Sequence, residues 1–511
     1  SVALAGGATL SVTSPAKANV WSHVAGVFDG TRIKLYVNAT LVASRVAAGT
    51  LQQSAQPLHI GGWPSWNAYL GEIDEAWLGG VALSAQQVQV LARRTTSFGY
   101  DWPNAVSSSN SDPWLVTNHD EICELKPRIL ALNFVNDPSG ANFSTNVNEV
   151  IAGLTEGSRY HGYGDPNALP ALRPEVFKAV DLSDATPVPG WNHKNSSKFP
   201  LKCLGGGDYK FKYSQLFDPQ FTSYYNVPDP AVPGANLGLC DLVTRGQVQE
   251  VWLFIDGDSD AVTCPNGVTY SDFQPLESVE SKQVYTSNGS KVPGSFDSCA
   301  GNGCLDGQDE PAFVACGKSL KVVYVNSTRG PGCAIHSLGH SFESIARAGG
   351  SVPALGTEFL HFGNFDLNLR FPVGFQSWYG IIGDPTSGIT FTGTNALTWS
   401  AYSGAFHGVM NPYDQGCGNV HFAPNSREHY DDQNTQSVFS TCEHYGLHDG
   451  PAGKDIKVLY NKSKSDLYNG LAPDCGGGWQ VYWRQSFPGV NNPAWTATGN
   501  KMKNWWPYLY Y

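Results

Sequence analysis

Two histidines and a glutamate within residues 333–350, CAIHSLGHSFESIARAGG, have the spacing of a binding site. Gly330, Pro331 and Gly332 precede this segment and Gly349-Gly350 ends it, so a helix of about four turns fits between them. On such a helix His336, His340 and Glu343 stand at i, i+4 and i+7 and share one face. Two imidazoles and a carboxylate that face one way are ligands suited to a transition metal such as zinc.

This face has a second interpretation, a buried polar network in which the three side chains bond to one another and to the backbone. The His-Glu-x-x-His motif of metalloproteases places its general base directly after the first histidine, where this chain has Ser337. The spacing alone therefore leaves both the metal site and the network open. Gly339 lies beside the face, and its missing side chain is expected to let another segment or an ion come close.

The composition bounds the class of protein. The chain has 511 residues, enough for two or more domains, and its 56 Gly and 32 Pro with only 15% charged residues predict many loops. A net charge of -12 argues against nucleic acid as a partner. No run of 18 apolar residues occurs, so no membrane span is expected. Because the chain begins with Ser1, we expect a processed or partly recorded sequence.

Two counts predict a secreted, extracellular glycoprotein. Eleven cysteines without a CxxC pair suit five disulfides in an oxidising compartment, with one cysteine left over. Six acceptor sequences for N-glycosylation occur in polar, turn-like contexts where the asparagine is expected to be reachable. They are Asn38, Asn142, Asn195, Asn288, Asn326 and Asn461.

Residues 1–103 are predicted to be all-β. Strands are expected at Trp21–Phe28, Arg32–Val37 and Thr40–Ser44, and a helix at Leu83–Arg94. The stretch WSHVAGVFDGTRIKLYVNATLV, followed by LHIGG, GEIDEAWL and ALS, resembles the second half of a laminin-G-like (concanavalin A-like) jelly-roll module. The resemblance implies binding of carbohydrate or protein, often with calcium, and a sheet completed by residues from outside this chain's first hundred.

A polar linker is predicted at residues 104–114, and residues 115–511 form one large α/β or α+β domain. Its expected elements are strands at Arg128–Val135, Gln249–Ile255 and Ser319–Val325 and a helix at Asn146–Glu156. The segment 160–233 is crowded with Pro, Gly and aromatic residues and is expected to form long loops packed by rings.

Residues 120–511 resemble an uncharacterised family of secreted bacterial, fungal and algal proteins. The resemblance rests on EVWLF at Glu250–Phe254, AIHSLGHSFES, GNVHFAPN with Tyr430-Asp431 after it, and the closing NWWPYLYY. Ser341 stands where the family has Arg after Gly-His. The histidine of the GNVHF segment, His421, is the candidate to meet His336 and His340 as a further metal ligand, with a strand-end histidine bonded to backbone as its alternative.

Two acidic segments are candidate calcium sites because carboxylates are the ligands calcium prefers. The first leaves the strand at 249–255 with carboxylates at alternate positions, and the second lies between Cys304 and Cys316 and resembles half of a low-density-lipoprotein-receptor class A module. A disulfide-closed acidic turn is the alternative for the second. The residues are Asp256, Asp258 and Asp260, and Asp306, Asp309 and Glu310.

Two functions follow from these features. The first is an adhesive or structural extracellular role, in which the partial sandwich binds glycans, other proteins or further copies of the chain. The second is a metal-dependent hydrolase that acts on an extracellular polymer through the histidine face. The Trp-rich C-terminal segment is interpreted as core packing, with a sugar-stacking surface as its alternative.

Overall fold

The computed structural model divides the chain into two compact units, residues 1–96 and 97–511. Apart from a few single positions, it describes residues 2–3, 9–13, 22–52, 122–135, 141–183, 198–203, 208–255, 320–347, 355–366, 389–400, 407–410, 416–447 and 455–509, with short strands between 262 and 301. The predicted linker at 104–114 lies outside these ranges.

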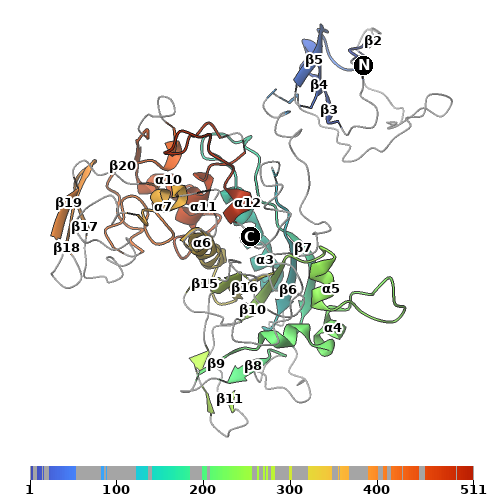
Figure 1. Ribbon diagram of the computed structural model, residues 1–511, viewed down its shortest axis with the longest axis vertical. Coiled ribbons are helices and arrows are strands. Elements are labelled where there is room, and N and C mark those ends of the chain that lie inside the picture. The colour runs from blue at the N-terminus through green and yellow to red at the C-terminus, as the bar shows by residue number, and fades with distance from the viewer. Residues whose placement is uncertain are drawn as a thin grey trace. The chain divides into compact units, whose positions relative to one another are not determined.

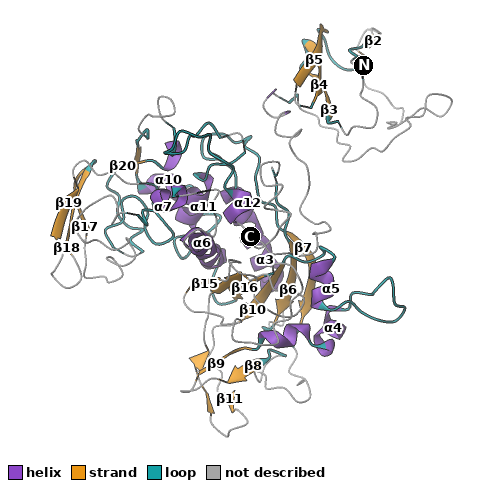
Figure 2. Ribbon diagram, viewed as in Figure 1, coloured by secondary structure: helices purple, strands orange, loops and turns teal. Residues whose placement is uncertain are grey.

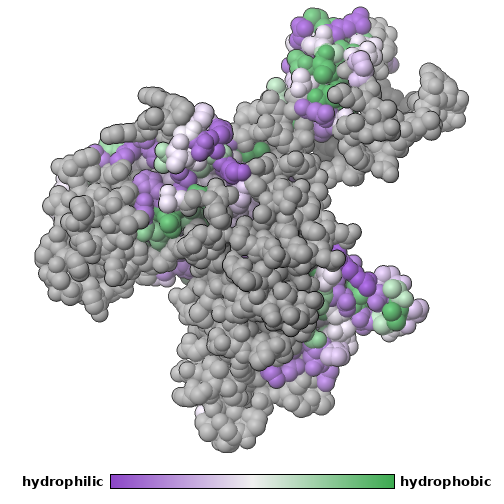
Figure 3. Space-filling model, in the orientation of Figure 1, coloured by the Kyte–Doolittle hydropathy of each residue, from purple (hydrophilic) through white to green (hydrophobic). Residues whose placement is uncertain are grey.

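The described part of the first unit is an antiparallel β-sheet (Figure 1). Strands β3 (Val24–Phe28), β4 (Arg32–Val37) and β5 (Thr40–Val46) pair in that order, with β4 in the middle. Asp29 accepts hydrogen bonds from the backbone N–H groups of Thr31 and Arg32, which fixes the turn between β3 and β4. Apolar side chains remain on the surface of this sheet (Figure 3), namely Val24, Leu41, Val42 and Val46.

The second unit is built on a six-stranded sheet with the order β15-β14-β16-β10-β6-β7. Strands β6 (Arg128–Asn133), β7 (Glu175–Asp181), β10 (Glu250–Ile255) and β16 (Lys321–Asn326) run parallel. Strands β14 (Ser278–Ser281) and β15 (Ser298–Gly301) join antiparallel at one edge. The unit is thus a mixed α/β structure with a largely parallel sheet.

Both faces of the sheet are covered by helices (Figures 1 and 2). Every residue of β10 and β16 is buried, and alternate residues belong to different cores, as expected for a sheet covered on both sides. Trp252 and Val323 pack with α3 (Ala141–Gly157) and α6 (Pro331–Arg347). Leu253 and Val322 pack on the other face with α4 (Pro219–Tyr225) and α5 (Leu239–Thr244).

The prediction of loops over 160–233 is wrong in part. Strand β7 forms the edge of the main sheet there, and α4 covers one of its faces. Pro219 occupies the first turn of α4, where a missing N–H costs nothing, and the Asp218 side chain caps that helix by accepting from the N–H of Gln220. Here proline starts a helix, whereas the sequence interpretation took the many prolines of this segment as a sign of long loops.

The other described elements are short. Three small sheets have two strands each: β1 (Val2–Ala3) with β2 (Thr9–Leu10), β11 (Val262–Thr263) with β12 (Thr269–Tyr270), and β20 (Val438–Ser440) with β21 (Val458–Tyr460). Two further sheets have three strands each: β8 (Leu201–Cys203) with β9 (Asp208–Phe211) and β13 (Asp272–Phe273), and β17 (Ile389–Gly393) with β18 (Ala396–Ser400) and β19 (His407–Met410). The remaining helices are η2 (Tyr213–Phe217), α7 (Glu358–Phe362), η4 (Cys442–His444), α10 (Lys462–Asp466), α11 (Gly477–Gln485) and α12 (Trp506–Leu509).

The Trp-rich C-terminal segment is core, as the sequence interpretation favoured. Trp483 in α11 and Trp505 and Trp506 at α12 are fully buried and pack edge-on against Phe359, Phe362 and Phe342, respectively. These contacts attach the end of the chain to α6 and α7. None of the helices in the described ranges has the length and apolar character that crossing a bilayer requires.

Candidate metal centre

Helix α6 begins two residues before the predicted start, at Pro331, because a carboxylate from a distant loop caps it. Asp474 accepts hydrogen bonds from the backbone N–H groups of Gly330 and Gly332, each 2.8 Å long. A negative charge at the first turn is favourable to the helix dipole. Gly332 must be glycine, since a Cβ there would lie 2.1 Å from the carbonyl oxygen of Asp474. The loop at 474 is therefore held against the helix start.

The two sides of α6 have different tasks. Ile335, Leu338 and Phe342 are fully buried in the core against the main sheet and α3. His336 and His340 face away from that core and are 7% and 9% exposed. The amphipathic spacing in the sequence thus places the apolar stripe on the sheet and the histidine face toward the second half of the unit, as predicted.

The two imidazoles of α6 turn the same ring atom toward each other. The Nε2 atoms of His336 and His340 are 3.2 Å apart. The opposite ring atoms are each held by an acceptor, because Nδ1 of His340 lies 2.8 Å from Oε2 of Glu343 and Nδ1 of His336 lies 3.2 Å from the carbonyl oxygen of Cys475. A carbonyl or carboxylate oxygen accepts, so both Nδ1 atoms carry the proton.

This arrangement leaves two nitrogen lone pairs facing each other. In a neutral imidazole protonated at Nδ1, Nε2 is an acceptor, and two acceptors at 3.2 Å repel unless a proton or a metal ion lies between them. Nitrogens bound about 2.0–2.1 Å from a tetrahedral zinc ion lie roughly 3.3 Å from each other. The observed separation suits a shared ion. Metal-bound histidines usually donate their other ring N–H to an oxygen acceptor, as both Nδ1 atoms do here.

The third histidine comes from the loop that carries GNVHF. Ring nitrogens of His336, His340 and His421 lie within 4.8 Å of one another, and the ring centroid of His421 is 4.5 Å from that of His340. Helix α11 fixes this loop by donating side-chain hydrogen bonds to three consecutive carbonyl oxygens of residues 418–420. The donors are Trp483, Trp479 and Gln480, at 2.9, 2.9 and 2.7 Å.

Glu343 joins the helix and the loop. Its Oε1 accepts from the backbone N–H of Val420 at 2.8 Å, while its Oε2 holds His340. The carboxylate predicted as a metal ligand therefore lies behind His340 and orients it, and it has no place among the converging ring nitrogens. Gly339 allows the close approach, since a Cβ there would lie 2.8 Å from Val420 and 2.9 Å from Gln480. The sequence expectation that another segment comes near Gly339 is confirmed.

Tyr430 covers the outer side of the histidines. Its ring centroid lies 4.2 Å from that of His421 and 5.4 Å from that of His336, with a 19° angle to the latter. The residue is 47% exposed, far more than the histidines beneath it. Its backbone N–H donates to the carbonyl of His421 at 3.1 Å. The sequence interpretation noted Tyr430 in a motif but assigned it no role, because a lone tyrosine in a loop carries no spacing signal.

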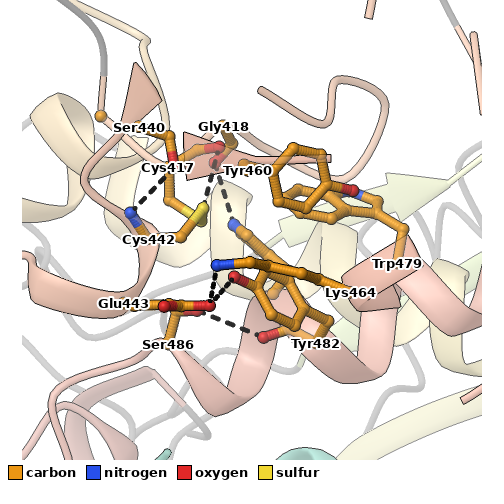
Figure 4. The surroundings of a disulfide bond; sticks show 12 residues. Cys417, Gly418, Ser440, Cys442, Glu443, Tyr460, Lys464, Trp479, Tyr482 and Ser486 are labelled. Atoms are coloured by element: carbon orange, nitrogen blue, oxygen red, sulfur yellow. Dashed lines mark hydrogen bonds and ion pairs between the residues drawn. A yellow bond between two sulfur atoms is a disulfide. The ribbon is translucent and has the colours of Figure 1, made fainter. Parts of the chain in front are cut away.

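Two disulfides brace the centre. Cys333 of α6 is bonded to Cys475, whose carbonyl holds His336, and Cys417 is bonded to Cys442 at the base of the GNVHF loop. Below the second disulfide, Glu443 accepts from Lys464 at 2.6 Å and from Tyr482 at 2.9 Å (Figure 4). Cys333, Asp474 and Cys475 also lie close enough to suggest a metal cluster. The two cysteine sulfurs are bonded to each other in the disulfide, and Asp474 caps α6, so this cluster is structural.

The remaining predicted sites are either outside the described ranges or different from expectation. Asp256, Asp258, Asp260, Asp306, Asp309, Glu310, Asn195 and Asn288 lie outside those ranges, so calcium binding stays a prediction. Asn38 is exposed in the turn after β4, and Asn142 is in the first turn of α3. Asn326 ends β16 only 6% exposed, with its side-chain oxygen bound to Thr328. The reachable context expected there is wrong, because that sequon continues a buried strand. Asn461 caps α10 by accepting from Ser463.

Comparison with known proteins assigns the first unit. The sequence model of the concanavalin A-like lectin/glucanase superfamily matches residues 2–89. This stretch is a concanavalin A-like domain. The laminin-G-like resemblance of the concanavalin A-like domain is thereby confirmed, and its antiparallel sheet agrees with it.

The other comparisons assign no further part of the chain to a known fold. No curated protein matches the chain. A crystal structure of an S-layer domain-containing protein (residues 221–444) from Clostridium thermocellum is 29% identical over 16% of this chain and 42% of that chain. The match thus covers less than half of the S-layer protein fragment, and its TM-score of 0.14 supports no shared fold.

Proposed function

We propose that the second unit is a metal-dependent hydrolase acting on an extracellular polysaccharide, with the ion bound by His336, His340 and His421. The observation that carries the proposal is the 3.2 Å separation of the Nε2 atoms of His336 and His340, while the Nδ1 atom of each ring lies beside an oxygen acceptor. Three histidines leave one position of a tetrahedral ion open, and zinc in such a site lowers the pKa of a bound water to about 7.

The chain's own residues then have defined roles. Glu343 keeps His340 in the tautomer that presents Nε2, and the Cys475 carbonyl does the same for His336. The α6 core and the α11 hydrogen bonds hold helix and loop at a fixed separation. The concanavalin A-like domain belongs to a superfamily that includes lectins and glucanases, which supports a polysaccharide as the substrate. Disulfides support an oxidising, extracellular location.

Metal analysis of the full chain tests this proposal. Protein purified at pH 7.5 without chelator should contain about one equivalent of a transition metal, and His340→Ala should contain none. His361→Ala is the matched control, because His361 is a half-buried histidine paired with Asp366 at 3.2 Å outside the centre. It should keep the metal. Release of reducing ends from polysaccharides should stop on chelation and return with zinc. A wild-type chain without stoichiometric metal contradicts the proposal.

A second candidate, adhesion or self-assembly, rests on the surface of the first unit. Four apolar residues of β3 and β5 are 41–63% exposed on the concanavalin A-like domain. A contiguous exposed apolar surface is found where proteins bind partners, and the candidate requires these side chains to contribute to one. The candidate predicts that purified chains form filaments or higher oligomers by sedimentation and negative-stain microscopy. Val24→Ser with Val46→Ser should then return the chain to monomers, and a wild-type chain that is monomeric at high concentration excludes it.

A further inference from the structure

We infer that Tyr430 is the substrate-contacting residue of the histidine centre and holds the sugar ring next to the bond that is cleaved. The inference rests on the proposed function and adds to it the group that selects a carbohydrate chain. Its exposed ring borders two of the three histidines, at 4.2 and 5.4 Å between centroids. A polymer that reaches the centre from solvent therefore meets Tyr430 first.

The backbone of Tyr430 adopts a conformation that is unfavourable for a bulky side chain. Its φ is +61°, in the left-handed region that bulky side chains avoid. Among the described non-glycine residues with positive φ, three are asparagines, which tolerate this conformation; they are Asn38, Asn226 and Asn364. The other three are His161, Tyr430 and Cys475, and the last two both contact the histidine centre. Strain of this kind gathers at functional sites.

The strained turn is held rigidly from both sides. Arg427 donates through Nε and Nη2 to the two carboxylate oxygens of Asp431, at 2.6 and 3.1 Å. Burial alone would raise the pKa of Asp431, but the hydrogen bonds from Arg427 hold it below its usual value. Ser426 Oγ donates to the Asp431 carbonyl at 3.1 Å. These bonds fix the turn that carries the ring of Tyr430.

A fixed, half-exposed phenol is suited to a sugar. The aromatic face packs against the apolar C–H face of a pyranose, and the hydroxyl at its rim can exchange hydrogen bonds with ring hydroxyls. Because the imidazoles lie under one side of the ring, a sugar on Tyr430 places its neighbour in the chain over the histidines.

Cobalt substitution gives a direct reading of this contact. The full chain is loaded with Co²⁺, whose visible spectrum reports on its ligands, and is titrated with cello-, laminari-, xylo- and chito-hexaose. At least one should change the spectrum in a saturable way. Tyr430→Asn, which keeps the left-handed backbone without strain and removes the ring, should raise the half-saturation concentration about tenfold. Tyr430→Phe, which keeps the ring, should change it by less than about threefold.

The outcomes separate the two levels of the argument. A wild-type chain that binds no Co²⁺ overturns the proposed function and this inference with it. A chain that binds Co²⁺ but shows no spectral change with any hexaose overturns the inference alone. Equal half-saturation concentrations for wild type and Tyr430→Asn, with equal Co²⁺ content, overturn it as well, because the ring then makes no contact with the sugar.

Discussion

The second unit contains two buried groups of ionisable side chains that look alike in a list of residues but differ in their geometry. At the start of the main sheet, Lys321 of β16 lies beside Glu250 of β10, with Nζ and Oε1 3.9 Å apart, and Trp252 donates to Glu250 at 2.7 Å. Both charged residues are almost completely buried. In the histidine centre, Glu343 accepts hydrogen bonds at both carboxylate oxygens, from His340 and Val420, and the two histidine Nε2 atoms lie 3.2 Å apart.

The difference shows how to distinguish a structural ion pair from a candidate cation site. The Glu250–Lys321 pair contains a charge of each sign, so it is electrically complete and has no use for a ligand. At the histidine centre the Nε2 atoms of two imidazoles lie 3.2 Å apart, and the proposed ion would bind between them. Burial and charge are common to both, and only the direction of the protons separates them.

Removing one partner of the complete pair should have the largest effect on stability. Glu250→Ala takes the carboxylate from a buried ammonium, which costs about 3–5 kcal/mol in the free energy of unfolding. Urea denaturation checks this. The metal content of the folded fraction should not change. The double variant Glu250→Leu with Lys321→Met should recover most of the loss, since an apolar pair of similar volume avoids the desolvation cost. Metal loss in Glu250→Ala would break the distinction between the two regions.

The sequence predicts the parts of this architecture that local patterns encode. β4 occupies Arg32–Val37 as expected from alternation, and β10 and β16 start within two residues of their predicted positions. The histidine face of α6 follows from a period of 3.6 residues. By contrast, Glu343 binds Val420 across 77 residues and His336 binds Cys475 across 139. Both partners are backbone groups, which are not specific to a residue type, so no sequence pattern predicts these contacts.

A pH titration of stability sharpens the contrast without touching the histidines. Burial lowers the pKa of Lys321 to about 8, against a partial rise from Glu250 and a further decrease from Arg484. Between this value and 10.5 the unfolded chain binds more protons than the folded one, so stability rises with pH in that window, by up to about 1.4 kcal/mol per pH unit from this group. Lys321→Met should remove this slope. Identical slopes from pH 8 to 10 in both proteins would show that the lysine keeps an ordinary pKa.

The smallest expected effect is on metal affinity. Glu343→Gln keeps the volume, but its single oxygen can accept from Val420 or from His340 and not from both, because an amide NH2 replaces the other oxygen. Loss of such a supporting contact weakens metal binding about 10- to 100-fold. Competition with a chromophoric chelator measures it. The control is Glu358→Gln, which makes the same change of side chain at a glutamate that accepts a hydrogen bond from Tyr445 outside the centre. Gln480→Glu is unsuitable as a control because Gln480 accepts a hydrogen bond from Arg484. A polar network without metal predicts no metal affinity to lose.

The disulfide between Cys333 and Cys475 can form only after the later cysteine has been synthesised. The two cysteines are 142 residues apart, and synthesis at about 5–20 residues per second separates their appearance by roughly 7–30 seconds. During this interval α6 has been made, but the carbonyl that fixes His336 and the helix that positions His421 have not. We therefore expect the metal to be loaded after translation and oxidation are complete. Metal content of chains produced in reducing and in oxidising hosts checks this. On this proposal, the ion would be taken up in the compartment in which the chain is oxidised, and not in the one in which it is translated.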